Sequence, residues 1–204
     1  EREFWMQRNR AARVQKRRQD KLGLGWANHD HHTYRSSREN FAKLVATFER
    51  LGLECRERFH AGPGASWGAQ VMESEEAGIV VFADVDMSAQ EVMGDFSHDG
   101  LGSSENLGTV GMWCALHGDS IFEAGMHHLE CQFAFEALAD GLSHEAGIEM
   151  MEPFSDLPIL RQQFTLGESW KVDAKRIERL LERGQISSAQ AKQFREHGAI
   201  GSHL

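Results

Sequence analysis

The sequence predicts an α+β protein in which one unit, a strand followed by a helix and three strands, occurs twice. Two observations predict this class. The first half of the chain reads in that order, and Gly52-Leu-Glu-Cys-Arg-Glu-Arg-Phe59 shares the pattern G-[LI]-E-x-x-E-x-F with Gly147-Ile-Glu-Met-Met-Glu-Pro-Phe154. A His-His pair precedes each copy, starting 21 residues before Gly52 and 20 before Gly147. Self-similarity of this kind indicates one supersecondary unit used twice, the alternative being a chance likeness between two acidic helix-to-strand junctions.

Length and charge set the limits for this fold. The 204 residues, 41% of them hydrophobic, suffice for one compact domain or for two small modules that share a core. The formal net charge is -9, yet residues 1–21 carry eight Lys or Arg against three acids, so the remainder carries -14. A body this acidic argues against a nucleic-acid-binding protein, which needs a broad positive surface.

Residues 1–25 are predicted to form a basic helix outside both repeats. The segment 4–18 is rich in Arg, Gln and Ala, which favour a helix, and Gly23 and Gly25 mark its end. We expect this helix to pack on the acidic body or on a second subunit of a homodimer. A third reading makes it the working part of an interaction protein, which truncation of residues 1–21 would test.

The segment 26–87 is predicted to be the first module. A strand at 28–35 leads to a helix at 37–51, for which Ser36 and Glu39 form a capping-box signal and Gly52 a stop. One face of this helix is apolar at the i, i+3, i+4 and i+7 positions, occupied by Phe41, Leu44, Val45 and Phe48. Strands at 53–60, 67–73 and 79–86 complete the module.

The segment 88–108 is rich in Gly, Ser, Asp and Asn and is predicted to be a linker. The second module, 109–204, would contain a strand at 126–133, a helix at 135–146, and strands near 160–165 and 169–172. Helices at 176–183 and 188–197 follow, the second capped by Ser187 or Ser188.

Two histidine clusters are the strongest chemical signal. Five of the eleven histidines lie in them: His29, His31, His32, His127 and His128. Neutral imidazole binds Zn, Fe, Ni or Cu, and two clusters at equivalent places in two repeats favour a metal over ordinary hydrogen-bonding histidines. Since side chains at i and i+2 share a strand face, His31, Thr33 and Arg35 should face one way and His32 and Tyr34 the other. In the second cluster His127 should join the apolar face, which leaves His128 to line a cavity.

The order of elements and the histidines resemble the vicinal oxygen chelate (glyoxalase/extradiol dioxygenase) superfamily. That resemblance implies two modules forming a curved mixed sheet around a cavity. Asp30-His31-His32-Thr33-Tyr34-Arg35 more specifically resembles the D-H-x-x-[FY]-R motif of the 2-oxoadipate dioxygenase/decarboxylase (2-hydroxyglutarate synthase) family. The resemblance implies His31 as an iron ligand and Arg35 as the group that binds the carboxylate of a 2-oxo acid.

The same resemblance implies the rest of the site. His128 would be the second ligand, in His127-His128-Leu129-Glu130, and Gln162 in Leu160-Arg-Gln-Gln-Phe-Thr165 would bind substrate. The family's third ligand is a Glu in a tyrosine-rich strand that this chain lacks, and Glu168 is the candidate, with Glu196 or Glu130 as alternatives.

The leading functional hypothesis is a metal-dependent enzyme of the vicinal oxygen chelate type that acts on an anionic oxo acid or another bidentate oxygen ligand. A non-haem iron dioxygenase or decarboxylase for a 2-oxo acid is the specific form that the resemblance implies, and a lyase is an alternative. The cofactor would be Fe(II), with Zn, Ni or Mn as alternatives, because two histidines and one carboxylate leave open positions on the metal. The rival from another class is a non-catalytic small-molecule-binding module of the same fold.

The remaining expectations concern location. The longest run without charged residues, 59–72, is too short to cross a bilayer, and no secretory signal is visible. Three cysteines without C-x-x-C spacing favour a reducing compartment. We therefore expect a cytoplasmic protein without a membrane partner.

Overall fold

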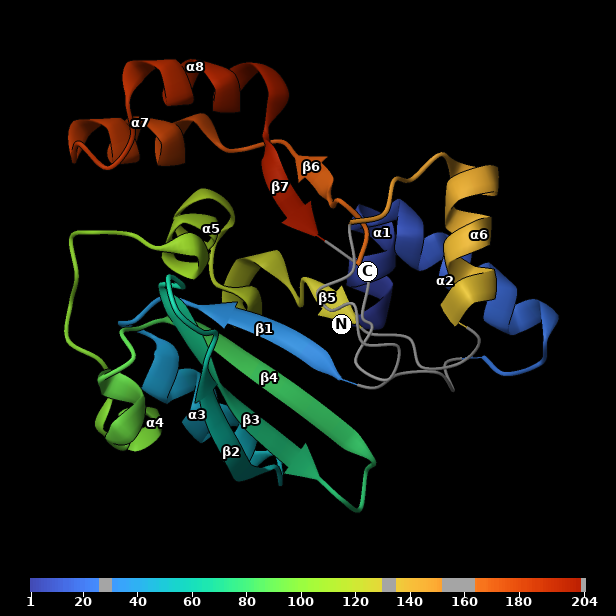
Figure 1. The fold of residues 1–204 in the computed structure, drawn as a ribbon, viewed down its shortest axis with the longest axis horizontal. Coiled ribbons are helices and arrows are strands. Elements are labelled where there is room, and N and C mark those ends of the chain that lie inside the picture. The colour runs from blue at the N-terminus through green and yellow to red at the C-terminus, as the bar shows by residue number, and fades with distance from the viewer. Residues whose placement is uncertain (26–30, 130–134, 152–163, 203–204) are drawn as a thin grey trace.

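A five-stranded mixed sheet is the centre of the molecule (Figure 1). The computed structural model describes residues 1–25, 31–129, 135–151 and 164–202. The strand order is β2-β3-β4-β1-β5, with β1 at His32–Ser36, β2 at Glu54–His60, β3 at Trp67–Ser74, β4 at Ile79–Asp86 and β5 at His128–Leu129. Only the β1–β4 pair is parallel among the pairs of this sheet. The expected α+β class with a curved mixed sheet is confirmed.

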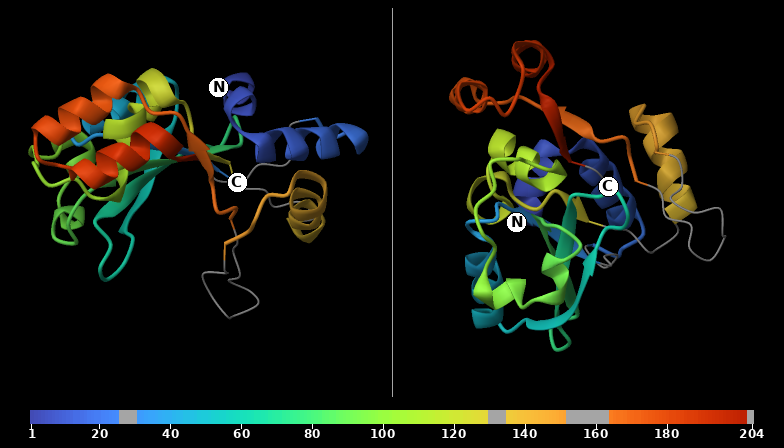
Figure 2. Two further views of the ribbon diagram at one scale, coloured as in Figure 1. Left: turned by 90° about the horizontal axis from the view of Figure 1, so that it is seen from above. Right: turned by 60° about the vertical axis from the view of Figure 1, so that its left-hand side comes forward.

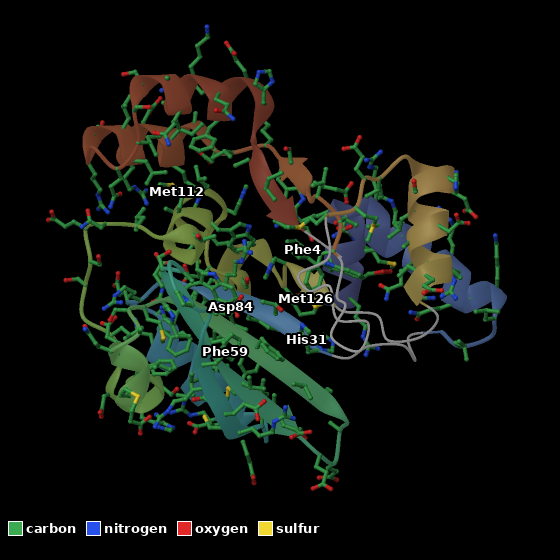
Figure 3. All side chains as sticks on the ribbon, in the orientation of Figure 1. Phe4, His31, Phe59, Asp84, Met112 and Met126 are labelled. Carbon is green, nitrogen blue, oxygen red and sulfur yellow. The ribbon has the colours of Figure 1, made fainter. Side chains whose placement is uncertain are left out.

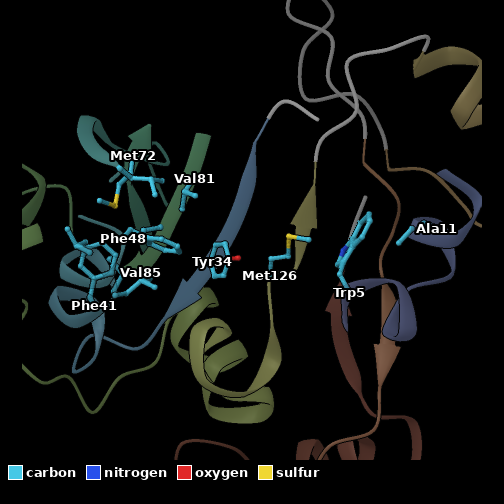
Figure 4. Close-up of a cluster of buried hydrophobic side chains, with 14 of the residues drawn as sticks. Trp5, Ala11, Tyr34, Phe41, Phe48, Met72, Val81, Val85 and Met126 are labelled. Atoms are coloured by element: carbon cyan, nitrogen blue, oxygen red, sulfur yellow. The ribbon is translucent and has the colours of Figure 1, made fainter. Parts of the chain in front are cut away.

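The first module has the predicted order of one strand, one helix and three strands. Helix α3, Phe41–Arg50, buries its predicted apolar face against one side of the sheet. On β4, Val81, Ala83 and Val85 point to the same side. Figure 4 shows this core, in which the Tyr34 ring meets Phe48 with their centroids 5.0 Å apart.

The start of α3 differs from the prediction. Ser36 is the last residue of β1, and no side chain caps the helix at Asn40. Instead the Asp119 carboxylate accepts hydrogen bonds from the Ser37 backbone N–H at 3.2 Å, the Ser37 hydroxyl at 2.8 Å and the Asn40 amide at 2.9 Å. This distant carboxylate thus accepts the hydrogen bonds of the turn before α3. The predicted capping box of Ser36 and Glu39 therefore does not determine where the helix begins.

The basic N-terminal segment forms two helices, α1 at Arg2–Arg8 and α2 at Arg10–Lys21. The break lies at Asn9, whose side-chain oxygen accepts a hydrogen bond from the Ala12 N–H at 3.1 Å and so caps α2. The apolar residues Trp5, Ala11, Ala12 and Val14 are buried in the main core. These helices therefore pack on the rest of this chain, which was one of the two arrangements expected for the basic segment.

The segment expected to be a linker contains structure. It holds the 3-10 turn η1, Glu91–Met93, and the short helix α4, Phe96–Asp99. Phe96 stacks on Phe41 with their ring centroids 5.5 Å apart. Two further elements were not predicted: α5 at Thr109–His117, and the π-helical turn η2 at Ser120–Ala124. Helix α5 is apolar on all sides, so it lacks the amphipathic period that identifies a surface helix.

The repeated sequence pattern marks the same junction twice. Gly52 and Gly147 each follow a helix with a left-handed φ of 89° and 59°. The Leu53 N–H then donates to the Phe48 carbonyl, and the Ile148 N–H to the Leu142 carbonyl, each at 3.0 Å. Both copies therefore turn from a helix into an extended segment in the same way.

The second module matches the prediction only in part. Helix α6 spans Phe135–Ala146 as expected, and residues near Met150 pair with those near Thr165. Of the predicted strand 126–133 the structure describes β5 alone, and 160–163 lie outside the described residues. Strands β6, Glu168–Trp170, and β7, Ala199–Ser202, form a separate two-stranded sheet rather than extending the central one.

The C-terminal helices α7, Ala174–Glu182, and α8, Ser188–His197, are close to the predicted ranges. Ser187 and Gln190 form a full capping box at the start of α8. The two helices lie side by side beyond α5 (Figure 2) and close a second core around Leu116 and Ile177. No helix in the described part of the chain is both long and apolar enough to cross a membrane.

Candidate functional site

The face of the sheet opposite α3 carries ionisable and aromatic side chains that could bind a ligand or transfer a proton. We call it the inner face. It consists of His31, Thr33 and Arg35 from β1 and its approach, with Phe82, Asp84 and Asp86 from β4. Thr33 pairs with Phe82 and Arg35 with Asp84 in the parallel register. Figure 3 labels His31, Phe59 and Asp84 along this face. The alternation predicted for the first histidine strand is thus confirmed, because Tyr34 packs on the α3 side.

Arg35 is held in a buried position on the inner face. Its backbone N–H donates to the Ser120 hydroxyl at 2.9 Å, and its guanidinium lies 5.0 Å from the centre of the Trp113 ring. The Nε atom is buried without a hydrogen-bond partner, and no described carboxylate lies within ion-pair distance. Burial lowers the pKa of this guanidinium, while Asp84, Cys114 and Asp86 act in the opposite direction.

Asp84 lies directly beside Arg35 on the next strand. Burial raises the pKa of its carboxyl to about 7, and the charge of Arg35 opposes the shift. Asp84 is not among the predicted site residues, since 79–86 was interpreted as a β-branched strand. The available signal was the two acids, Asp84 and Asp86, in a strand whose other residues are apolar, because a buried acid needs a partner or a function.

Asp86, two residues further on, has a structural task. Its carboxylate accepts hydrogen bonds from the Gly108 N–H at 2.6 Å and the Val110 N–H at 2.9 Å, at the start of α5. A negative charge at this helix end is stabilising. Helix α5 is thereby fixed over the inner face, with Trp113 beside Arg35.

Two adjoining cavities open at the carboxyl ends of β1 and β4. One of about 320 Å³ reaches Cys114 and Asp86, and one of about 560 Å³ extends past Ser66. Both are lined by Arg38, which already binds the Glu91 carboxylate at 2.5 Å. The inner-face residue that lines both cavities is Asp86, two residues beyond Asp84 on β4, whereas Arg35 and Asp84 themselves do not line either of these two cavities.

The other end of the inner face is aromatic. The His31 ring is half-buried and lies 4.3 Å from the Phe82 ring centre. Phe59 is 6.0 Å from Phe82 and 6.3 Å from Trp67. This wall can pack against the apolar or planar part of a small molecule.

The expected metal ligands are only partly brought together. His128 lies opposite Thr33 in the β1–β5 register, next to the His31 end of the strand, and its side chain is outside the described residues. Glu130 and Gln162 also lie outside the described residues. Glu196 is on α8, 3.9 Å from Lys192, on a helix that packs beyond α5.

Glu168, the first candidate for the third ligand, already has a strong partner. Its carboxylate accepts hydrogen bonds from the Arg10 backbone N–H at 2.5 Å and from the Arg10 Nε at 2.8 Å. Within the described ranges, the group of His, Cys, Asp and Glu side chains whose ligand atoms lie within 4.8 Å of one another is Glu49, Cys55 and His98, on the α3 side. No described carboxylate therefore completes a three-ligand set with His31.

His127 and His117 flank the same tryptophan. The buried His127 ring is 5.7 Å from Trp113, which agrees with its predicted place on an apolar face. His117 Nε2 is 3.1 Å from the Ile200 carbonyl, and burial lowers its pKa to about 4. His117 is therefore a neutral ring at pH 7 and ties α5 to β7.

Comparisons with known proteins give one distant likeness. No protein-family model matches the sequence, and no curated protein is significantly similar to it. Two solved structures of variants of Streptomyces coelicolor methylmalonyl-CoA epimerase, each in complex with 2-nitronate-propionyl-CoA, share 16% identity with this chain at a TM-score of 0.35. They cover 74% of this chain and 90% of theirs. The epimerase is a vicinal oxygen chelate (glyoxalase-like) protein and not a 2-oxoadipate dioxygenase, and a likeness below a TM-score of 0.5 does not place this chain in a family.

Proposed function

We propose that this protein binds a small carboxylic acid, of the oxo-acid class, on the inner face of its sheet. The observation that carries the proposal is the buried Arg35 guanidinium, whose Nε has no hydrogen-bond partner and which no described carboxylate approaches within ion-pair distance. A buried cation of this kind is costly unless an anion neutralises it. A substrate carboxylate would supply that charge through paired hydrogen bonds, for which the planar guanidinium is suited.

Asp84 gives the proposed site an acid–base group. With a pKa of about 7, its carboxyl can hold or release a proton at neutral pH. It lies on the strand next to Arg35, so a carboxylate bound by Arg35 would place its neighbouring atoms near this proton. The aromatic wall at His31, Phe82 and Phe59 would then exclude water from the rest of the ligand.

The metal-dependent form of this function is a dioxygenase or decarboxylase that acts on a 2-oxo acid. It would need His31, His128 and one carboxylate to hold Fe(II), Zn, Ni or Mn, which would polarise the keto oxygen when bound. The described residues do not fit this set, because Glu168 is engaged by Arg10 and no described carboxylate forms a three-ligand group with His31. Binding and proton transfer are therefore assigned here to Arg35 and Asp84 alone.

A non-catalytic binding module is the second candidate, and the engagement of Glu168 favours it. Elemental analysis of untagged protein separates the two. Stoichiometric metal that disappears in both His31→Ala and His128→Ala supports the enzyme. Protein that takes up no metal at these residues, yet binds an oxo acid, supports the binding module.

The substitution Arg35→Lys tests acid binding itself. We expect the affinity for 2-oxoglutarate and pyruvate, used as probes in calorimetry, to fall by about 10- to 100-fold, because lysine cannot form two parallel hydrogen bonds. Any metal content should stay unchanged. The matched control is Arg56→Lys on β2, at an arginine that already has acidic partners and lines neither cavity. Affinity for both probes within threefold of the unmodified protein in Arg35→Lys would refute the proposal.

A further inference from the structure

Three ligand-type side chains converge on the opposite side of the sheet, at the end of α3. His98 Nε2 lies 2.9 Å from Glu49 Oε1, and Cys55 Sγ lies 3.9 Å from the same oxygen. One ligand atom from each residue lies within 4.8 Å of both others. The three residues come from α3, β2 and α4, so the fold and not local sequence assembles them.

A fourth residue orients this group. Both carboxylate oxygens of Asp95 lie within hydrogen-bond distance of His98 Nδ1, at 3.0 and 2.9 Å. Such a bond holds one ring proton on Nδ1. The 2.9 Å contact of Nε2 with the Glu49 carboxylate is made through a second ring proton, and Nε2 becomes available as a metal ligand when that proton leaves. Metal-binding histidines in proteins are usually supported by a carboxylate in this way.

We propose that Glu49, Cys55 and His98 bind a divalent cation of the zinc type. In a tetrahedral zinc site, oxygen and nitrogen ligands lie about 3.4 Å apart and oxygen and sulfur about 3.6 Å. The observed separations of 2.9 and 3.9 Å lie close to both values, so small side-chain movements suffice. The carboxylates of Glu49 and Asp95 favour a cation, and thiolate with imidazole selects zinc over magnesium or calcium.

The cation would displace one proton from the Cys55 thiol and one from His98 Nε2, both to solvent, and would leave a fourth position for water. All three side chains are at least partly accessible, so an ion can reach the site. The inference does not depend on the proposed function, because the site lies on the α3 side and shares no residue with the inner face.

The expected effect is to fasten α4 to the sheet. This helix has only four residues, Phe96–Asp99, too few to be stable without tertiary contacts. At present Phe96 packs into the core and His98 bonds to Glu49. A cation shared by α3, β2 and α4 would join all three elements and stabilise the folded state in proportion to its affinity.

Titration of the full, metal-free protein with Co²⁺ tests the site directly. We expect a thiolate-to-cobalt charge-transfer band, displaced by Zn²⁺, and a rise in melting temperature with Zn²⁺. Cys55→Ser should abolish the band, and His98→Gln should weaken binding by more than 100-fold. Loss of the supporting carboxylate in Asp95→Asn should weaken binding by about 10- to 100-fold.

Two controls locate the ion. His144→Gln, at an exposed histidine on α6, and His197→Gln, at an exposed histidine on α8, should both bind Co²⁺ as the unmodified protein does. The proposal is overturned by absence of the band, or by a band that survives Cys55→Ser and His98→Gln at unchanged affinity. Should Cys55→Ser fail to fold, Glu49→Gln gives the same test, with a loss of at least tenfold expected.

Discussion

Arg35 and Asp84 are two charged residues placed where a protein normally keeps apolar ones. The motif and the strand alternation were enough to select Arg35, because both depend on local sequence alone. Asp84 could not be selected in this way, since its altered acidity comes from burial beneath elements distant in the chain. The same limit applies to Asp119, which replaces the predicted capping box through hydrogen bonds to Ser37 and Asn40.

Asp84 should make the stability of the protein depend on pH. Its carboxyl has a pKa of about 7 when folded and an ordinary value of 3.8, so the folded state holds a proton that the unfolded chain releases. Stability therefore falls as pH rises between these values, by about 1.4 kcal/mol per pH unit. Between pH 5 and pH 8 the unmodified protein should lose up to about 3 kcal/mol more than Asp84→Asn.

Urea unfolding at both pH values measures this difference. The control Asp140→Asn removes an exposed carboxylate of α6 and should keep the pH dependence of the unmodified protein. An identical pH dependence in Asp84→Asn and in the unmodified protein would mean that this carboxyl titrates normally.

Elements with a clear periodic pattern were predicted well, and those without one were missed. Helices α3 and α7 each have an apolar stripe, and β4 matches its predicted range of 79–86. Helix α5 has no stripe because it is covered on several sides, by the sheet below and by α7 above. The split of the N-terminal helix at Asn9 was also missed. Asparagine is a preferred N-cap residue, and its side chain in addition contacts Ser202 at the far end of the chain.

That contact gives a prediction for the α1–α2 junction. The Asn9 side chain caps α2 and also donates to the Ser202 hydroxyl, which in turn donates to the His127 carbonyl. Asn9→Ala removes one cap and one buried hydrogen bond, and should lower the free energy of unfolding by about 2 kcal/mol. The measurement is chemical unfolding in urea.

Ser187→Ala provides the comparison, because Ser187 caps α8 at an exposed position. Its cost should be about 1 kcal/mol or less. Equal losses in the two variants would show that the Asn9 to Ser202 bond adds no stability.

The molecule as a whole contains separate apolar cores. The main core lies between the sheet, α3 and the N-terminal helices, and a smaller one joins α5 to α7 and α8. A third, minor cluster lies around Trp113 and Trp170. The sequence repeat correctly predicted the class and the first module. It did not predict this division, because the later strands β6 and β7 pair with each other instead of with the central sheet.

Two cores predict two units of unfolding. Ile177 is fully buried in the smaller core, and Ile177→Ala should destabilise that core by about 2 to 5 kcal/mol. Hydrogen exchange should then accelerate in α7 and α8 while β3 and β4 keep their protection. Leu44→Ala, in the main core, should instead accelerate hydrogen exchange in β3 and β4. Uniform acceleration in both variants would show a single cooperative unit.

The parallel pairing of β1 with β4 has a consequence for how function can be lost. Arg35 meets Asp84 only in the observed register, and a slip of one residue would set Ala83 or Val85 opposite the guanidinium. The same slip would turn the apolar side of β4 away from α3. Strand misalignment would thus remove the proposed acid-binding pair and the hydrophobic core together, so a molecule that misfolds at this pair of strands would lose its stability along with the proposed site.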